Sequence, residues 1–150
     1  MRTHRKAQTM RLAYPVSLEP QDDGTVLVSF PDIPEALTDG DTEDEALSEA
    51  EDCLIAALGG YIELRRSIPK PSPARGRPLI ALPALAAAKL ALYCAMRSHG
   101  LGNTALAAEL GTTEGAVRRL LDLDHRSHID RVEAALRLFG ERLVVTTQAA

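Results

Sequence analysis

Apolar and polar residues alternate along the first part of the chain, which is the pattern of β-strands with one buried face. Residues 11–19 carry apolar side chains at every second position, and residues 25–30 form a second apolar run of this kind. The Asp-Gly pair at 23–24 falls between them and is typical of a tight hairpin. Pro15 predicts that the first strand lies at a sheet edge or carries a bulge, because proline donates no ladder hydrogen bond. We expect a third, short extended segment at residues 36–38.

A long helix is predicted to begin after Thr42. The Thr42 hydroxyl can cap the first turn while the Glu45 side chain reaches back to the start of the helix, which together form a capping box. Apolar residues then recur at three- and four-residue intervals and form one stripe, until Pro69 stops the helix. The glycine pair at 59–60 indicates a bend or a close backbone approach. Residues 79–82 suit a last strand, so the first module is predicted to be an α+β unit of order β-β-β-α-β.

The pattern after residue 83 is helical. An Ala-rich helix is expected to end at His99-Gly100, where glycine is a natural C-terminal cap. Three further helices are predicted at residues 103–110, 113–123 and 127–139, with Ser127 capping the last of them. Residues 142–147 form a β-prone tail that suits pairing across a two-fold axis.

Residues 103–120 carry the spacing of a helix-turn-helix. Ala107 provides a small side chain where two helices cross, and Gly111 follows at the turn, where a left-handed backbone is easiest for glycine. Thr113 can cap the second helix. The alternative is an ordinary helical hairpin within a bundle. The offsets resemble those of the lambda-repressor-like class, which implies an all-α DNA-binding domain.

In that geometry the N-terminal part of the second helix enters the major groove. Arg119 is the best candidate to bind a guanine through two hydrogen bonds, and Arg118 is expected to contact phosphate. The candidate DNA-binding residues are Thr113, Glu114, Gly115, Arg118 and Arg119.

Charge is distributed unevenly over the 150 residues, whose formal net charge is −4. Acidic residues outnumber basic ones by eight between residues 10 and 82, whereas residues 83–150 have one basic residue in excess. An acidic module beside a near-neutral one suggests different partners for the two. The acidic module is expected to attract basic surfaces, and the near-neutral one to need dimerisation for firm DNA binding.

Other features predict a cytoplasmic protein without cofactor or metal. Cys53 and Cys94 lie within apolar helical patterns and are expected to be free thiols. No apolar run is long enough to span a membrane, and the basic residues 1–9 have no apolar segment behind them, so we expect them to be a disordered extension. Met1 and Met10 are both possible starts. His125 and His128 lack further ligands beside them, which favours a surface role.

Residues 14–73 resemble the N-terminal domain of HicB-type antitoxins. The diagnostic pieces are PDIP after the second strand, TDGDT before the capped helix and IPKPSP at its exit. The run VRRLLDLDHRSHIDRVEAALRLFG is similar to the helix-turn-helix tail of that family. The resemblance implies a degenerate ribonuclease-H-like fold and a toxin-binding role for residues 10–82. It further implies a DNA-binding and dimerisation domain at 83–150, a small HicA-type messenger-RNA-cleaving toxin as partner, and autorepression by a homodimer or tetramer.

The acidic turns of the first module are the candidate toxin-binding surface, because such a toxin presents cationic groups to RNA. Its residues are Asp22, Asp23, Asp39, Asp41 and Glu43. Most of these acids are explained equally well as turn and cap residues. A catalytic role, in which several acids converge to hold metal ions, is therefore not needed to explain them. Two alternative functions stay open at this point. One is a stand-alone transcription regulator whose acidic module senses a ligand, and the other is a ribonuclease-H-type hydrolase.

Overall fold

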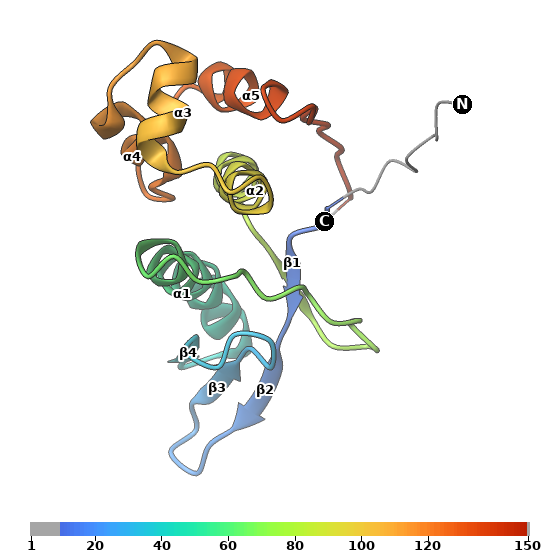
Figure 1. Ribbon diagram of the computed structural model, residues 1–150. Coiled ribbons are helices and arrows are strands. Elements are labelled where there is room, and N and C mark those ends of the chain that lie inside the picture. Colours follow the sequence, from blue (N-terminus) through green and yellow to red (C-terminus); the bar gives the residue numbers. More distant parts are fainter. Residues whose placement is uncertain (1–9, 150) are drawn as a thin grey trace.

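A computed structural model describes residues 10–149 of the chain, and the extension expected at residues 1–9 lies outside them. The chain forms two layers of structure (Figure 1). Strands and helix α1 make up the first, and four shorter helices make up the second. The order of elements agrees with the predicted α+β module followed by helices.

Within residues 10–149, five short strands form two antiparallel sheets instead of one. They are β1 (Ala13–Pro15), β2 (Ser17–Pro20), β3 (Val26–Ser29), β4 (Leu37–Gly40) and β5 (Leu79–Ala81). One sheet pairs β1 with β5, and the other has the order β2-β3-β4. The predicted strand at 11–19 is therefore wrong as a single strand, since it divides at Val16. The Val16 N–H donates to the Pro78 carbonyl at 3.0 Å, after which the chain leaves one ladder and joins the other.

Helix α1 (Glu43–Glu63) covers the three-stranded sheet, as Figure 1 shows. The predicted capping box is present. The Thr42 hydroxyl accepts from the Glu45 N–H at 3.2 Å, and the Glu45 carboxylate accepts from the Asp41 N–H at 3.1 Å. The apolar stripe of α1 is buried against the sheet through Ala46, Ala50, Leu54, Leu58 and Tyr61.

A close backbone approach occurs at Gly40 and not at the glycine pair of α1. A Cβ on Gly59 or Gly60 meets no atom within 4 Å, and α1 runs unbroken through both residues. A Cβ on Gly40 lies 2.4 Å from the backbone nitrogen of Ala46. The end of β4 therefore has to be glycine, because any side chain there pushes the strand away from the first turn of α1.

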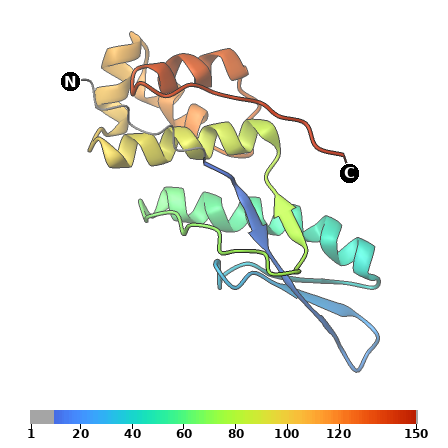
Figure 2. The same ribbon diagram turned by 90° about the vertical axis from the view of Figure 1, so that its right-hand side faces the viewer.

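The second layer consists of four helices, close to the predicted positions. They are α2 (Ala84–Ser98), α3 (Asn103–Leu110), α4 (Glu114–Leu121) and α5 (Ile129–Arg137). One detail of the prediction is wrong: the N-cap of α5 is His128 and not Ser127, whose hydroxyl donates to the Arg119 carbonyl. Residues 142–147 form no strand within this single chain, and Figure 2 shows them as an extended trace beyond α5. Their pairing across a two-fold axis stays a prediction.

Helix α2 joins the two layers. Ala86 and Leu90 on α2, with Leu123 after α4, belong to the core beneath the sheet, so that core extends past residue 82. A second core lies among α2, α3, α4 and α5. Polar contacts add to the connection, since the Tyr93 hydroxyl donates to the Arg66 carbonyl at 2.6 Å. The Arg97 side chain also donates to the hydroxyl of Ser67 at 3.0 Å.

Candidate functional site

The turn between α3 and α4 has the geometry that the spacing predicted. Gly111 adopts a left-handed conformation, with φ of 64° and ψ of 37°. The Gly111 N–H donates to the Ala108 carbonyl and the Thr112 N–H to the Ala107 carbonyl, which is the Schellman arrangement that ends a helix. The Thr113 hydroxyl accepts from the Ala116 N–H at 3.1 Å and starts α4. Both helix ends at the turn are thus satisfied by the chain itself.

The predicted DNA-binding residues lie together at α4, but their side chains differ in whether they already have partners within the chain. The Thr113 hydroxyl is occupied by its capping bond. Glu114 and Arg118 form an ion pair with each other at 2.5 Å. The guanidinium of Arg119 lies over the first turn of α4, because its Nη1 atom is 3.9 Å from the place where a Cβ on Gly115 would stand. Arg119 is exposed, and its charge is therefore carried to the N-terminal part of α4.

A buried lysine forms hydrogen bonds at the C-terminal end of α4. It was not among the residues predicted to be functional. Lys89 on α2 is fully buried. Its Nζ donates to the carbonyls of Arg119, Asp122 and His125 at 2.9, 2.7 and 2.7 Å. Burial lowers the pKa of the Lys89 ammonium, and the three carbonyls satisfy its donors. The available signal in the sequence is a lysine on the apolar face of an Ala-rich helix.

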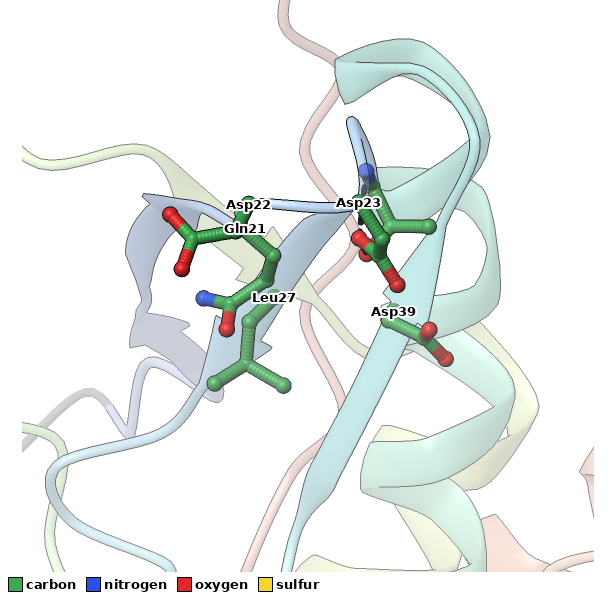
Figure 3. A pocket seen from close by; sticks show the side chains of 6 residues that line it. Gln21, Asp22, Asp23, Leu27 and Asp39 are labelled. Carbon is green, nitrogen blue, oxygen red and sulfur yellow. Dashed lines mark hydrogen bonds between the residues drawn. The ribbon is translucent and has the colours of Figure 1, made fainter.

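The five acidic residues predicted to bind a toxin gather at one end of the three-stranded sheet. Asp22, Asp23 and Asp39 line a shallow hollow of about 400 Å³, as Figure 3 shows. Asp41 and Glu43 follow at the junction of β4 and α1, outside the hollow. All five are exposed.

One of these acids also has a structural role in the hairpin. The Asp23 carboxylate accepts from the N–H and the hydroxyl of Thr25 at 3.0 and 2.7 Å. The hydroxyl contact, followed by the backbone contact, lowers the pKa of Asp23. The turn role considered for Asp23 is therefore present in the structure, while its side chain stays accessible.

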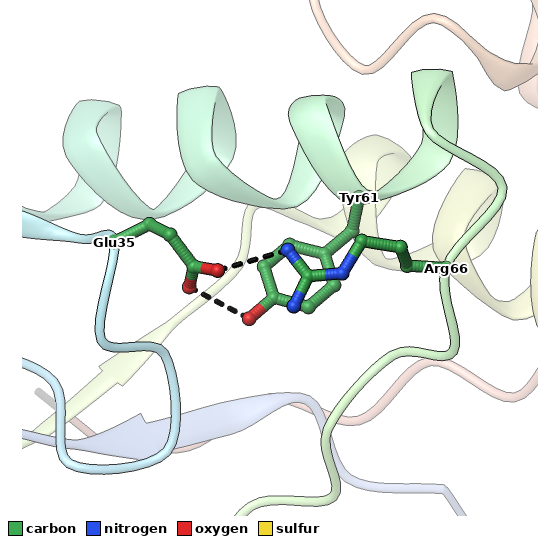
Figure 4. Close-up of polar contacts among 3 residues, drawn as sticks. All are labelled: Glu35, Tyr61 and Arg66. Carbon is green, nitrogen blue, oxygen red and sulfur yellow. Dashed lines mark hydrogen bonds and ion pairs between the residues drawn. The ribbon is translucent and has the colours of Figure 1, made fainter.

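A polar cluster that was not predicted from the sequence connects the segment before β4 to the end of α1. Glu35 accepts from the Tyr61 hydroxyl at 2.7 Å and from Arg66 at 2.9 Å, as Figure 4 shows. The Arg66 guanidinium also stacks on the Tyr61 ring, 4.1 Å from its centre. These contacts, that of Tyr61 first, lower the pKa of Glu35 to about 2.

We expect the Glu35 cluster to make folding stability depend on acid pH. A carboxylate whose pKa is lowered by folding adds stability above its ordinary pKa of 4.5, and this contribution is lost as the pH falls from there toward 2. Urea unfolding between pH 6 and 2 measures it. Glu35→Gln should be less stable than the wild type at pH 6, with the difference shrinking toward pH 2. Glu49→Gln, on the exposed side of α1, controls for the loss of a carboxylate. A difference for Glu35→Gln that stays constant with pH would contradict the expectation.

Among residues 10–149, no three His, Cys, Asp or Glu side chains come together as a metal site. Within the same residues no helix has the length and apolar character needed to cross a bilayer. Cys53 and Cys94 are free and half-buried, and burial raises the pKa of both thiols.

Comparison with known proteins places the chain in a family. The family described as HicB-like antitoxin of bacterial toxin–antitoxin systems matches residues 13–91. Antitoxin HicB 2 of Photorhabdus laumondii is 42% identical over 132 residues, which is 88% of this chain and 94% of the relative. Antitoxin HicB of Escherichia coli K12 is 38% identical over 133 residues, or 88% of this chain and 96% of the relative. Antitoxin HicB of Pseudomonas fluorescens is 37% identical over 132 residues.

These alignments extend beyond the first module. An alignment of 132 of the 150 residues omits 18, so it includes most of the chain after residue 91 as well. The likeness to the antitoxins therefore covers both the sheet with α1 and helices of the second layer. The chain belongs to the HicB-like antitoxin family of bacterial toxin–antitoxin systems, whose members are antitoxins and not enzymes.

Proposed function

We propose that this antitoxin inhibits a HicA-type messenger-RNA-cleaving toxin with its first module and represses its own operon through α3 and α4. The observation that carries the proposal is the capped turn at Gly111 followed by an exposed α4 with Arg119 over its first turn. This is the geometry in which a second helix presents its N-terminal residues to base edges. Membership of an antitoxin family supplies the partner class.

Several finer assignments belong to the same proposal. The first module is taken as a degenerate ribonuclease-H-like fold and the second as lambda-repressor-like, with a functional division near residue 82. A homodimer or tetramer acting in the cytoplasm suits a helix-turn-helix module of low net charge, because dimerisation doubles its contacts with DNA. A hydrolase is set aside, since the relatives are antitoxins. A stand-alone regulator is disfavoured for the same reason.

Co-purification tests the antitoxin role. The tagged chain is expressed from its native operon and isolated with whatever its neighbouring gene encodes. A small basic protein that cuts RNA alone, and stops doing so when bound, is the expected result. An operon without such a protein would favour the stand-alone regulator. Operator binding is tested separately by mixing the purified chain with the promoter duplex that precedes its gene.

The acidic end of the sheet is expected to speed toxin binding. Complementary charge accelerates the encounter of two proteins, and salt weakens the effect. We therefore expect slower toxin association, and a smaller dependence on salt, after neutralising the five acids by substitution with Asn or Gln. The replaced residues are Asp22, Asp23, Asp39, Asp41 and Glu43. Asn at 23 keeps an oxygen that can accept from Thr25.

A second set of acids provides the control for net charge. Glu49, Glu51, Asp52 and Glu63 are exposed on α1 in the same module. Their neutralisation should change the association rate much less than that of the five acids. Stopped-flow mixing at low and high salt measures both variants. Equal effects of the two sets would mean that overall charge matters and that the sheet end is no specific contact surface.

A further inference from the structure

A second hollow lies beside α4 in the helical layer, on the side toward α5. It has a volume of about 400 Å³ and is bounded by the α3–α4 turn, α4, the loop after it and α5. Leu110 and Leu120 are apolar parts of its lining. Arg119, Arg126 and Arg131 line it as well. No acidic residue does so.

Among residues 10–149, the arginines of this hollow and the exposed Arg142 after α5 have no hydrogen-bond or ion-pair partner, unlike the other basic residues of the layer. Lys89 is buried and bound to carbonyls. Arg97 donates to the segment after α1. Arg118 and Arg137 pair with glutamates on their own helices. Basic charge that is free to meet a ligand is therefore concentrated at the hollow, although residues 83–150 have only one basic residue in excess.

The lining also contains other polar groups. Thr112 contributes a hydroxyl group, and His125 and His128 contribute ring nitrogens, while the Ser127 hydroxyl donates to the Arg119 carbonyl. The acids of the neighbouring segment are not part of the lining, and one of them, Asp122, accepts from the Asp124 N–H at 3.0 Å. Arginines with a hydroxyl donor around an apolar floor match the anionic oxygens of a phosphodiester.

We propose that this hollow holds the phosphate backbone of the duplex whose bases α4 contacts, with Arg126 and Arg131 as its phosphate-binding residues. This inference rests on the proposed DNA-binding role of α4 and adds a phosphate-binding role for the hollow beside that helix. Arg119 borders both places, since its guanidinium lies over the first turn of α4 while its side chain also lines the hollow. A backbone seated at Arg126 and Arg131 fixes the register in which Arg119 meets a base.

The test compares two double variants of the full chain. Arg126→Gln with Arg131→Gln removes the charges of the hollow. Arg137→Gln with Arg142→Gln removes the same charge from exposed positions outside it. Affinity is measured by fluorescence anisotropy over a series of salt concentrations. The two probes are the promoter duplex and a scrambled duplex of equal length.

The variant of the hollow should bind both duplexes more weakly by a similar factor, roughly tenfold or more. The slope of log affinity against log salt is negative, and each lost phosphate contact makes it less steep by about 0.9. The magnitude of the slope should therefore decrease by about 2. The control variant should keep the slope of the wild type. Arg126→Lys with Arg131→Lys should restore it, because the positive charges are kept. Thermal unfolding checks that each variant is folded.

Three results would overturn the proposal: an unchanged slope, an equal loss in the control variant, or a loss confined to the promoter duplex. The last would mean that Arg126 and Arg131 contact bases. A different result would contradict the proposed recognition of bases by α4. If Arg119→Ala leaves promoter preference intact while the salt slope still depends on Arg126 and Arg131, the phosphate assignment stands and base recognition by α4 does not. If the wild type binds neither duplex, both are overturned.

Discussion

Replacing Lys89 by methionine is expected to lower the free energy of unfolding by roughly 1.5–3 kcal/mol, the usual contribution of a hydrogen bond to a charged group, because the bonds from the Lys89 Nζ atom to three carbonyls are lost together. Methionine fills a similar volume, so the loss of three hydrogen bonds dominates the effect. Each carbonyl keeps a second donor, which limits the loss. The Ser127 hydroxyl donates to the Arg119 carbonyl at 3.4 Å, the His125 N–H to the Asp122 carbonyl at 3.2 Å and the Ser127 N–H to the His125 carbonyl at 3.0 Å. Urea unfolding followed by circular dichroism measures the change.

Buried charges are not always stabilising, and this case needs its own comparison. A buried ion pair can be exchanged for apolar residues at little cost when both partners are removed together. Here the acceptors are backbone carbonyls at the end of α4 and in the loop after it, which no substitution removes. Lys70→Met, at an exposed position, is the matched control and should change stability by less than about 0.5 kcal/mol. A Lys89→Met protein as stable as this control would contradict the role assigned to Lys89.

The features that the sequence predicted well are those decided by near neighbours. The capping box at Thr42 needs only residues three or four positions away. The turn at Gly111 depends on its own left-handed conformation and on carbonyls within five residues. Local hydrogen bonds of this kind are specified by residue type and spacing, which is why the turn between α3 and α4 could be predicted from the sequence.

The features that escaped prediction depend on distant parts of the chain. The division at Val16 is set by Pro78 and β5, more than 60 residues later. The Lys89 donors reach carbonyls 30 to 36 residues away. The local pattern of residues does not show which distant segments pair with each other.

The candidate DNA-binding site was also only partly visible in the sequence. The net charge of residues 83–150 suggested weak electrostatic attraction to DNA, because a net charge counts all basic residues alike, whether paired or free. The structure separates basic residues that are already paired from those that are free, and within residues 83–149 the free ones other than Arg142 border α4. The same separation distinguishes Arg118, paired with Glu114, from Arg119. We expect different consequences from replacing each of them.

Arg119→Ala is expected to lower affinity for the promoter duplex about five- to 150-fold. An arginine that binds a guanine through two hydrogen bonds contributes roughly 1–3 kcal/mol, and its removal relaxes specificity at that base. The position of its guanidinium over Gly115 places it in the part of α4 that we propose enters the major groove. The scrambled duplex should lose less affinity than the promoter, because it offers no matched guanine.

Arg118→Ala should behave differently. Its guanidinium has to leave Glu114 before it can contact DNA, so its net contribution is smaller and falls on phosphate. Both duplexes should then be weakened alike. Arg137→Ala, on α5 and paired with Glu133 at 2.9 Å, is the control and should leave both affinities unchanged.

The double variant Arg118→Ala, Arg119→Ala decides whether α4 contacts the operator. Removing both side chains leaves Glu114 as an unpaired negative charge near the first turn of α4, which adds repulsion from phosphate to the lost contacts. Promoter preference should therefore disappear, and the remaining affinity should be no better than that for the scrambled duplex. Anisotropy titrations with single-base substitutions in the promoter locate the lost contact. Wild-type promoter affinity in this variant would mean that another surface binds the operator.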